Sequence, residues 1–133
     1  MNIAFTKVKD VASPKKAYKS DAAYDLYLPR ENTAGVFLMP GERKTVPLGI
    51  KICLSDGYFS FLCPRSGLAS EFGIGFVNGF GVIDQYHGEL HAILINHSDK
   101  DVFIPNGTRV AQLIIRPMVE SKLIELGSGA FGE

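Results

Sequence analysis

Residues 64–90, PRSGLASEFGIGFVNGFGVIDQYHGEL, contain a polar turn, a short helix-like piece and an apolar run that ends abruptly on Asp84. The polar segment 85–89, QYHGE, follows, and a second apolar run begins directly after it. Two strand-like runs around a polar tip predict a β-hairpin. Only residues 66–72, SGLASEF, have a composition suited to a helix, of about two turns.

Short apolar runs separated by turn residues recur outside this stretch. The Asp56-Gly57 pair between two of them predicts another hairpin, and Pro40-Gly41 and Asn106-Gly107 mark further turns. Many short strands at regular spacing predict an all-β sandwich or barrel. The predicted strands are residues 2–8, 24–28, 35–39, 44–54, 58–63, 89–96, 102–105 and 109–118.

Three of these runs are apolar on both alternating sets of side chains: residues 49–54, 92–95 and 111–115. Such runs predict that both faces of the strand are buried. One face would lie in the core of the sandwich, and the other is expected in a contact between subunits.

Composition bounds the function. The chain has 133 residues, which suits one compact domain, and its 14 Lys and Arg balance its 14 Asp and Glu. This neutral balance argues against a polybasic nucleic-acid surface, so any phosphate site must depend on local arginines and backbone amides. No apolar run approaches the length of a membrane span, and the first ten residues do not resemble a signal peptide. We expect no nucleic-acid or membrane partner.

The cysteines and histidines add little chemistry. Cys53 and Cys63 lie in apolar runs and are expected to be small buried thiols, which fits a reducing cytoplasm. The histidines, at positions 87, 91 and 97, lack the spacing of a zinc site.

The stretch 64–90 also carries groups suited to a phosphate-containing substrate. Arg65 offers a fork of donors for phosphate oxygens, and Gly67 lets the backbone approach a ligand closely. Asp84, at the end of a strand, is a candidate general base. Each feature has a simpler interpretation: Pro-Arg-Ser-Gly as a surface turn, and Asp84 as a turn residue that bonds to its own backbone.

Five segments together carry a stronger signal. DAAYDL (21–26), PRSGLA (64–69), GVID (81–84), YHGE (86–89) and RVAQLI (109–114) resemble the trimeric dUTP pyrophosphatase family in order and spacing, over residues 21–132. The resemblance implies a jelly-roll-like β-barrel and a homotrimer whose active sites are shared between subunits. It also implies Mg²⁺-dependent hydrolysis of dUTP to dUMP and pyrophosphate.

The resemblance also implies roles for single residues. Asp25 would position Mg²⁺ through water, and Asp84 would activate the attacking water. Arg65, Ser66 and Gly67 match the phosphate-binding segment, with free N–H groups if a helix begins near Ser66. Gln112 matches a residue that bonds a phosphate or an ordered water.

A hairpin from Asn78 to Glu89 would hold the nucleoside. Its backbone at Gly81 and Val82, with the Asn78 amide, would match the edge of uracil and exclude the methyl group of thymine. Tyr86 resembles the tyrosine that packs against the deoxyribose and leaves no room for a 2′-hydroxyl.

The chain departs from the family pattern at three places. Only Gln85 separates Asp84 from Tyr86, where the family commonly has two residues, and Ala23 replaces a usual glycine. Residues 1–126 would form the barrel, and residues 127–133, GSGAFGE, a shortened lid arm. Phe131 matches the aromatic residue that covers uracil, but Leu126 stands at an arginine position and the Ser/Thr end is missing. A frayed glycine-rich terminus is the alternative.

Two other functions stay open from the sequence. A dCTP deaminase of the same fold would need a general acid/base near C4 of the base, and the segment 81–89 lacks that family's usual pattern. A nucleotide-binding regulatory protein with weak catalysis would fit the incomplete tail.

Overall fold

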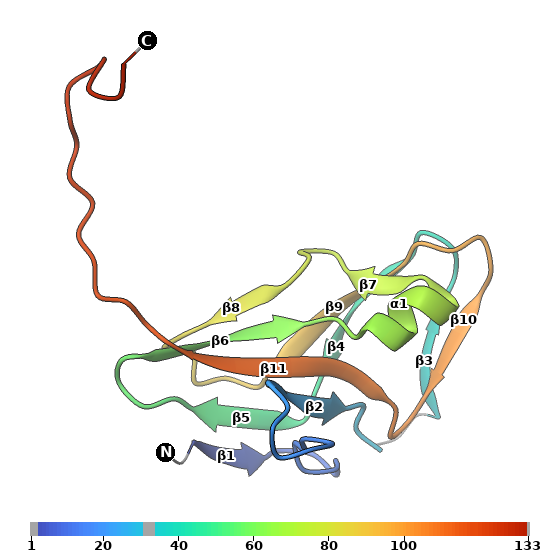
Figure 1. The fold of residues 1–133 in the computed structure, drawn as a ribbon. Helices are drawn as coiled ribbons and strands as arrows, with labels where there is room; N and C mark the ends of the chain where they lie inside the picture. Colours follow the sequence, from blue (N-terminus) through green and yellow to red (C-terminus); the bar gives the residue numbers. More distant parts are fainter. Residues whose placement is uncertain (1–2, 31–33, 133) are drawn as a thin grey trace.

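The computed structural model describes residues 3–30 and 34–132, which form an all-β fold with one short helix, as predicted (Figure 1). The elements in chain order are β1 (Ala4–Lys7), β2 (Ala23–Tyr27), β3 (Gly35–Leu38), β4 (Arg43–Pro47), β5 (Ile50–Cys53), β6 (Tyr58–Cys63), α1 (Ser66–Phe72), β7 (Ile74–Phe76), β8 (Gly81–Ile83), β9 (His91–Asn96), β10 (Val102–Pro105) and β11 (Arg109–Pro117). No helix of the described residues is long and apolar enough to span a membrane.

The strands pair across long stretches of sequence. The largest sheet has the order β2-β11-β6-β8, a second has the order β4-β9-β7, and β1-β5 and β3-β10 form two-stranded sheets. All pairs are antiparallel, and none of the pairs in the described chain joins consecutive strands. This connectivity fits the predicted jelly-roll-like barrel, in which the chain passes repeatedly from one sheet to another.

The two predicted hairpins are therefore wrong. At Asp56-Gly57 the chain does turn, with the Tyr58 N–H donating to the Ser55 carbonyl at 3.2 Å. However, β5 pairs with β1, and β6 pairs with β11 and β8. The segment 85–89 likewise connects β8 to β9, which lie in different sheets. Each flanking strand buries its apolar side against the core from a different layer, and a hairpin would place both strands in the same layer.

The predicted strand over residues 44–54 is two strands. It breaks at Leu48 and Gly49, between β4 and β5. Gly49 has a φ of 78°, and a Cβ there would lie 3.1 Å from side-chain atoms of Pro29 and Val11. A tight left-handed turn in a crowded place needs glycine, and it divides the apolar run.

The core lies between the layers and collects one face of each strand. Leu62 of β6 and Leu113 of β11 are register partners, and both are buried, as is Leu94 of β9. The prediction that both faces of β5 are buried is wrong, since Ile50 and Ile52 are buried while Lys51 and Cys53 are exposed. In β9 and β11 the second face is half-buried, at residues 93, 95, 114 and 115.

The helix α1 has the predicted bounds. It buries Leu68 and ends at Gly73, whose φ is 68° and whose N–H donates to the Ala69 carbonyl at 3.0 Å. This is a left-handed glycine cap, which closes the last turn of the helix. The cap directs the chain straight into β7, so the helix is fixed between β6 and β7.

The chain leaves the barrel at the end of β11. Met118 still donates its N–H to the Gly57 carbonyl at 2.7 Å, but residues 116–132 are all exposed. Figure 1 shows this segment extending away from the strands, in red. The division of the chain at residue 126 stays a prediction.

Candidate active site

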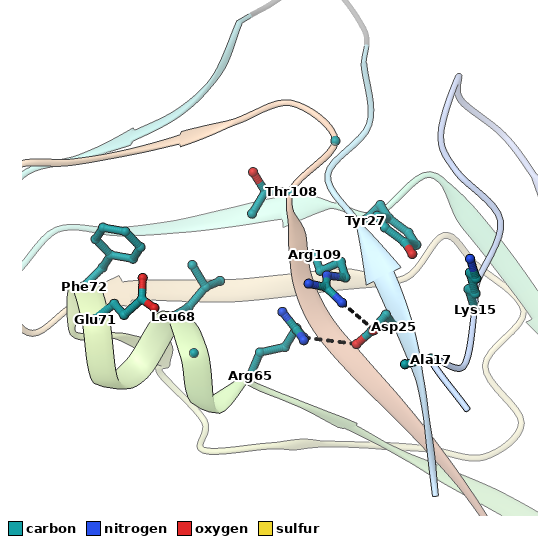
Figure 2. Close-up of a pocket in the computed structure, with 12 residues that line it drawn as sticks. Lys15, Ala17, Asp25, Tyr27, Arg65, Leu68, Glu71, Phe72, Thr108 and Arg109 are labelled. Atoms are coloured by element: carbon teal, nitrogen blue, oxygen red, sulfur yellow. Dashed lines mark hydrogen bonds and ion pairs between the residues drawn. The ribbon is translucent and has the colours of Figure 1, made fainter. Parts of the chain in front are cut away.

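The largest cavity, of about 790 Å³, lies beside the start of α1 and the ends of β2 and β11 (Figure 2). We call it the arginine cavity. It is lined by Lys15, Ala17, Asp25, Tyr27, Arg65, Gly67, Leu68, Glu71, Phe72, Gly107, Thr108 and Arg109. Three cationic and two acidic side chains face it, so it carries a net positive charge suited to an anionic ligand.

Asp25 joins two arginines in this cavity (Figure 2). Its Oδ1 accepts a hydrogen bond from Arg65 Nε at 3.0 Å, and its Oδ2 lies 3.6 Å from Arg109 Nη1. The Asp25 side chain is only 15% exposed, whereas Arg109 is 51% exposed. A shielded carboxylate therefore holds two guanidinium groups at the cavity wall, and each keeps further donors for a ligand.

Three elements bring these charges together. Asp25 is on β2, Arg109 begins β11, and Arg65 precedes α1. The β2–β11 pairing shifts register between Arg109 and Ala111, and a β-bulge of this kind changes the direction of a side chain. Sequence reasoning assigned no role to Arg109. The available signal was its place at the head of the motif RVAQLI.

Gln112 links the strands to the phosphate-binding segment. It pairs with Asp25 on one side of β11 and with Cys63 on the other. Its Nε2 donates to the Pro64 carbonyl at 3.0 Å. This bond fixes the backbone immediately before Arg65, so Gln112 supports the arginine cavity without being among its lining residues.

Arg65 and Gly67 of the predicted phosphate segment line the arginine cavity. Ser66 is exposed and is not among the lining residues. The nearby Cys63 is half-buried, and burial raises the pKa of its thiol, so the thiol is held in its neutral form.

A second cavity, of about 210 Å³, lies between β7, β8 and the start of β9. We call it the tyrosine cavity. It is lined by Leu62, Phe76, Asn78, Gly81, Ile83, Tyr86, Glu89, Leu90, His91 and Ile93. Apolar walls with a few convergent polar groups are typical of a site for a small organic ligand. Within the described ranges, the two cavities share no lining residue.

The structure places Asn78, Gly81 and Tyr86 together in the tyrosine cavity. A Cβ at Gly81 would lie 3.7 Å from Asn78 Nδ2, so the amide faces the bare backbone of this glycine. Val82 is 61% exposed and does not line the cavity with its side chain.

Two predicted residues lie outside both cavities. Asp84 is exposed, one residue beyond β8, and its Oδ1 accepts the Gln85 N–H at 2.8 Å. This local contact is the one that the simpler interpretation of a turn aspartate predicts. Phe131 is 94% exposed on the extended segment after β11 and touches neither cavity in this chain.

A barrel that offers a cationic cavity and a separate cavity with apolar walls and an amide fits the class of all-β nucleotide-binding proteins. Comparison with known proteins then specifies the family. The sequence model of the dUTPase family matches residues 9–129. The chain belongs to the dUTPase family.

Similar proteins agree with this assignment. The deoxyuridine 5′-triphosphate nucleotidohydrolase of Tropheryma whipplei is 42% identical over 130 residues, which cover 90% of this chain and 86% of that protein. The protein of the same name from Gloeobacter violaceus is 37% identical, with coverage of 88% and 79%. The dUTPase of phage phi11 of S. aureus superposes with a TM-score of 0.84 at 21% identity and covers 95% of this chain and 96% of its own. That structural likeness supports the fold.

Proposed function

We propose that this protein hydrolyses dUTP to dUMP and pyrophosphate, binding the triphosphate in the arginine cavity and the deoxyuridine in the tyrosine cavity. Membership of the dUTPase family makes it a dUTP hydrolase. The observation that carries the assignment of the phosphates is the Arg65–Asp25–Arg109 cluster. Two guanidinium groups at one cavity wall can bind several phosphate oxygens with charge-assisted bonds.

Mg²⁺ is the proposed cofactor. It usually keeps several waters and binds through one or two carboxylates and the phosphates of the substrate. Asp25, a carboxylate on the wall of the arginine cavity, fits this donor set as a ligand through water. When bound, the ion would neutralise charge on the phosphate oxygens. A dUTPase of phage phi11 of S. aureus has been described with a structural Mg(II) ion, which supports the assignment.

Asp84 is the proposed general base. It would take a proton from a water that attacks the α-phosphorus of dUTP. The new bond forms between the water oxygen and phosphorus, the bond to the bridging oxygen breaks, and pyrophosphate leaves. Arg65 and Arg109 would stabilise the charge that develops on the phosphates. Gln112, through Pro64, would keep Arg65 in place, and Ser66 and Gly67 would offer backbone N–H groups.

The tyrosine cavity is proposed to select the base and the sugar. The Asn78 amide and the backbone of Gly81 and Val82 would bond the polar edge of uracil. The Tyr86 ring would pack against the deoxyribose. A phage 80alpha dUTPase has been described with the analogue dUpNHpp, which supports this class of ligand.

A homotrimer is proposed to bring the two cavities together. Aromatic side chains on several strands are strongly exposed in the single chain, among them Phe5, Phe37 and Phe103. Exposed apolar side chains of this kind often mark contacts between subunits. In such an assembly, Phe131 of one copy would cover the uracil bound to another copy.

The test is pyrophosphate release from dUTP, dTTP, dCTP and UTP, each with and without Mg²⁺. We expect turnover of dUTP alone, and only with the metal. Equal turnover of dCTP or dTTP would overturn the assignment of the tyrosine cavity. Binding of dUTP without turnover would instead indicate a nucleotide-binding protein.

A further inference from the structure

Glu89 lies where three distant segments of the chain meet. It precedes β9 and lines the tyrosine cavity. The neighbouring Leu90 exchanges backbone hydrogen bonds with Leu48 and Ile50, at 2.8 and 2.9 Å. Val8 donates its N–H to the Gly49 carbonyl at 2.8 Å, which brings the segment after β1 to the same place.

The carboxylate of Glu89 ties these segments together. Lys9 Nζ donates to both of its oxygens, at 2.7 and 2.8 Å, and the Gly49 N–H donates to Oε2 at 2.8 Å. The two side chains are 26% and 17% exposed, so water screens this ion pair much less than a surface pair. The main chain at Glu89 is therefore fixed from two sides.

The carbonyl of Glu89 in turn holds Tyr86. The Tyr86 hydroxyl donates to it at 2.9 Å, and His91 Nδ1 donates to it at 2.8 Å. The tyrosine ring lies directly over Gly88, where an added Cβ would lie 2.3 Å from the hydroxyl oxygen. Tyr86 is 49% exposed, so packing alone does not fix it, and its orientation depends on these contacts.

We propose that Glu89 is a positioning residue for sugar recognition: with Lys9 and Gly49 it fixes the carbonyl that orients Tyr86, and Tyr86 in turn excludes a 2′-hydroxyl. This inference rests on the proposed function, in which the tyrosine cavity takes the deoxynucleoside. Glu89 does not touch the reacting atoms, so it acts on the choice of nucleotide rather than on the chemical step.

The main test is Glu89→Gln, which keeps the size of the side chain and an oxygen that can accept the Gly49 N–H. It loses the charged bonds to Lys9. We expect the preference for dUTP over UTP, as a ratio of kcat/KM values, to fall about five- to tenfold, as the loss of a charge-assisted bond allows. The change should lie in KM, with kcat for dUTP nearly constant.

Two further variants make the test specific. Gly88→Ala leaves the Lys9–Glu89 pair intact but pushes the Tyr86 ring aside, and should reduce the preference at least as much. Glu42→Gln is the matched control. Glu42 also accepts a backbone N–H, from Met39 at 2.9 Å, and lies 3.9 Å from a lysine, but it lines neither cavity.

Calorimetry with dUMP and UMP separates this inference from the proposed function, because it needs no turnover. A preference for dUMP that Glu89→Gln weakens supports the inference even if dUTP is not hydrolysed. An unchanged preference in folded Glu89→Gln overturns it while dUTP hydrolysis stands. Should Glu89→Gln fail to fold, an unchanged preference in Gly88→Ala has the same meaning.

Discussion

The arginine cavity takes its charged side chains from strands that pair across the largest sheet, whereas the tyrosine cavity takes its polar side chains from residues 78–91, between β7 and the start of β9. Asp25 and Arg109 are fixed by the β2–β11 ladder, and Arg65 by Gln112 through Pro64. Tyr86 is fixed by a few side-chain contacts that end at Lys9. The phosphate site is therefore a rigid part of the sheet, and the nucleoside site depends on a small polar cluster.

The largest expected effect concerns Asp84, in the less regular of the two regions. Asp84→Asn removes the proposed base and should lower turnover of dUTP by about 10²–10⁴, the usual range for general acid–base catalysis. Affinity should stay within a few-fold, because Asp84 lines neither cavity. Single-turnover kinetics and calorimetry measure the two quantities. Unchanged turnover would remove Asp84 from the mechanism.

Arg109 tests the arginine cavity. Arg109→Gln should weaken dUTP binding by about 1.5–3 kcal/mol, the size of a hydrogen bond to a charged group, and change dUMP binding little. Arg116→Gln is the control, since Arg116 is an exposed arginine on the same strand that lines neither cavity. Equal losses for dUTP and dUMP would mean that Arg109 supports the fold rather than the phosphates.

The cluster beneath the tyrosine cavity should show itself as a dependence of stability on pH. Burial alone raises the pKa of Glu89, but the hydrogen bonds from Lys9 and Gly49 outweigh it, with smaller help from the charges of Lys9 and His91, so the pKa lies below its ordinary value. A lowered pKa in the folded state contributes stability that is present above the pKa of unfolded glutamate. That contribution is lost as the pH falls through the folded pKa.

Glu89→Gln should therefore reduce the free energy of unfolding by about 1–2 kcal/mol at neutral pH. The difference from the parent protein should shrink in acid, below the ordinary range of glutamate. Urea unfolding at both pH values measures it. A deficit that is the same at both would show that the charge of Glu89 contributes nothing to stability.

The smallest effect on stability is expected from the exposed tail. Deleting residues 127–133 should change the free energy of unfolding by less than about 0.5 kcal/mol, as for other exposed sites. If Phe131 covers uracil in an assembled trimer, kcat/KM for dUTP should fall by a modest factor. Phe131→Ala in the full chain should then give the same loss, whereas Ser128→Ala should not.

The sequence predicts local features of this fold well and distant ones poorly. The bounds of α1 and β6 match the prediction because composition and turn residues decide them locally. The hairpins failed because Gly57 sets only the direction of the chain, while the strand partners depend on the layers of the barrel. The buried thiol predicted at Cys53 is exposed, since β5 alternates with its partner β1 at the edge.

The candidate site shows the same limit. Arg65, Gly67, Asn78, Gly81 and Tyr86 line cavities as their motifs indicated. The direction of Arg109 depends on a shift of register between β2 and β11, which the sequence does not reveal. The contacts of Glu89 join residues 80 and 40 positions apart, so no local pattern could indicate them.

The central position of β11 has a consequence for how the protein is made. This strand lies between β2 and β6, so the largest sheet stays open until residues 109–117 have been synthesised. Asp25 and Arg65 then wait on the nascent chain for Arg109 and Gln112, and the phosphate site forms only after most of the chain has left the ribosome. Folding dominated by such distant pairings is slow, on the order of milliseconds to seconds. During that interval the unpaired edges of β2 and β6 are exposed to other chains, and a ribosome-bound intermediate should be more prone to aggregate than the finished protein.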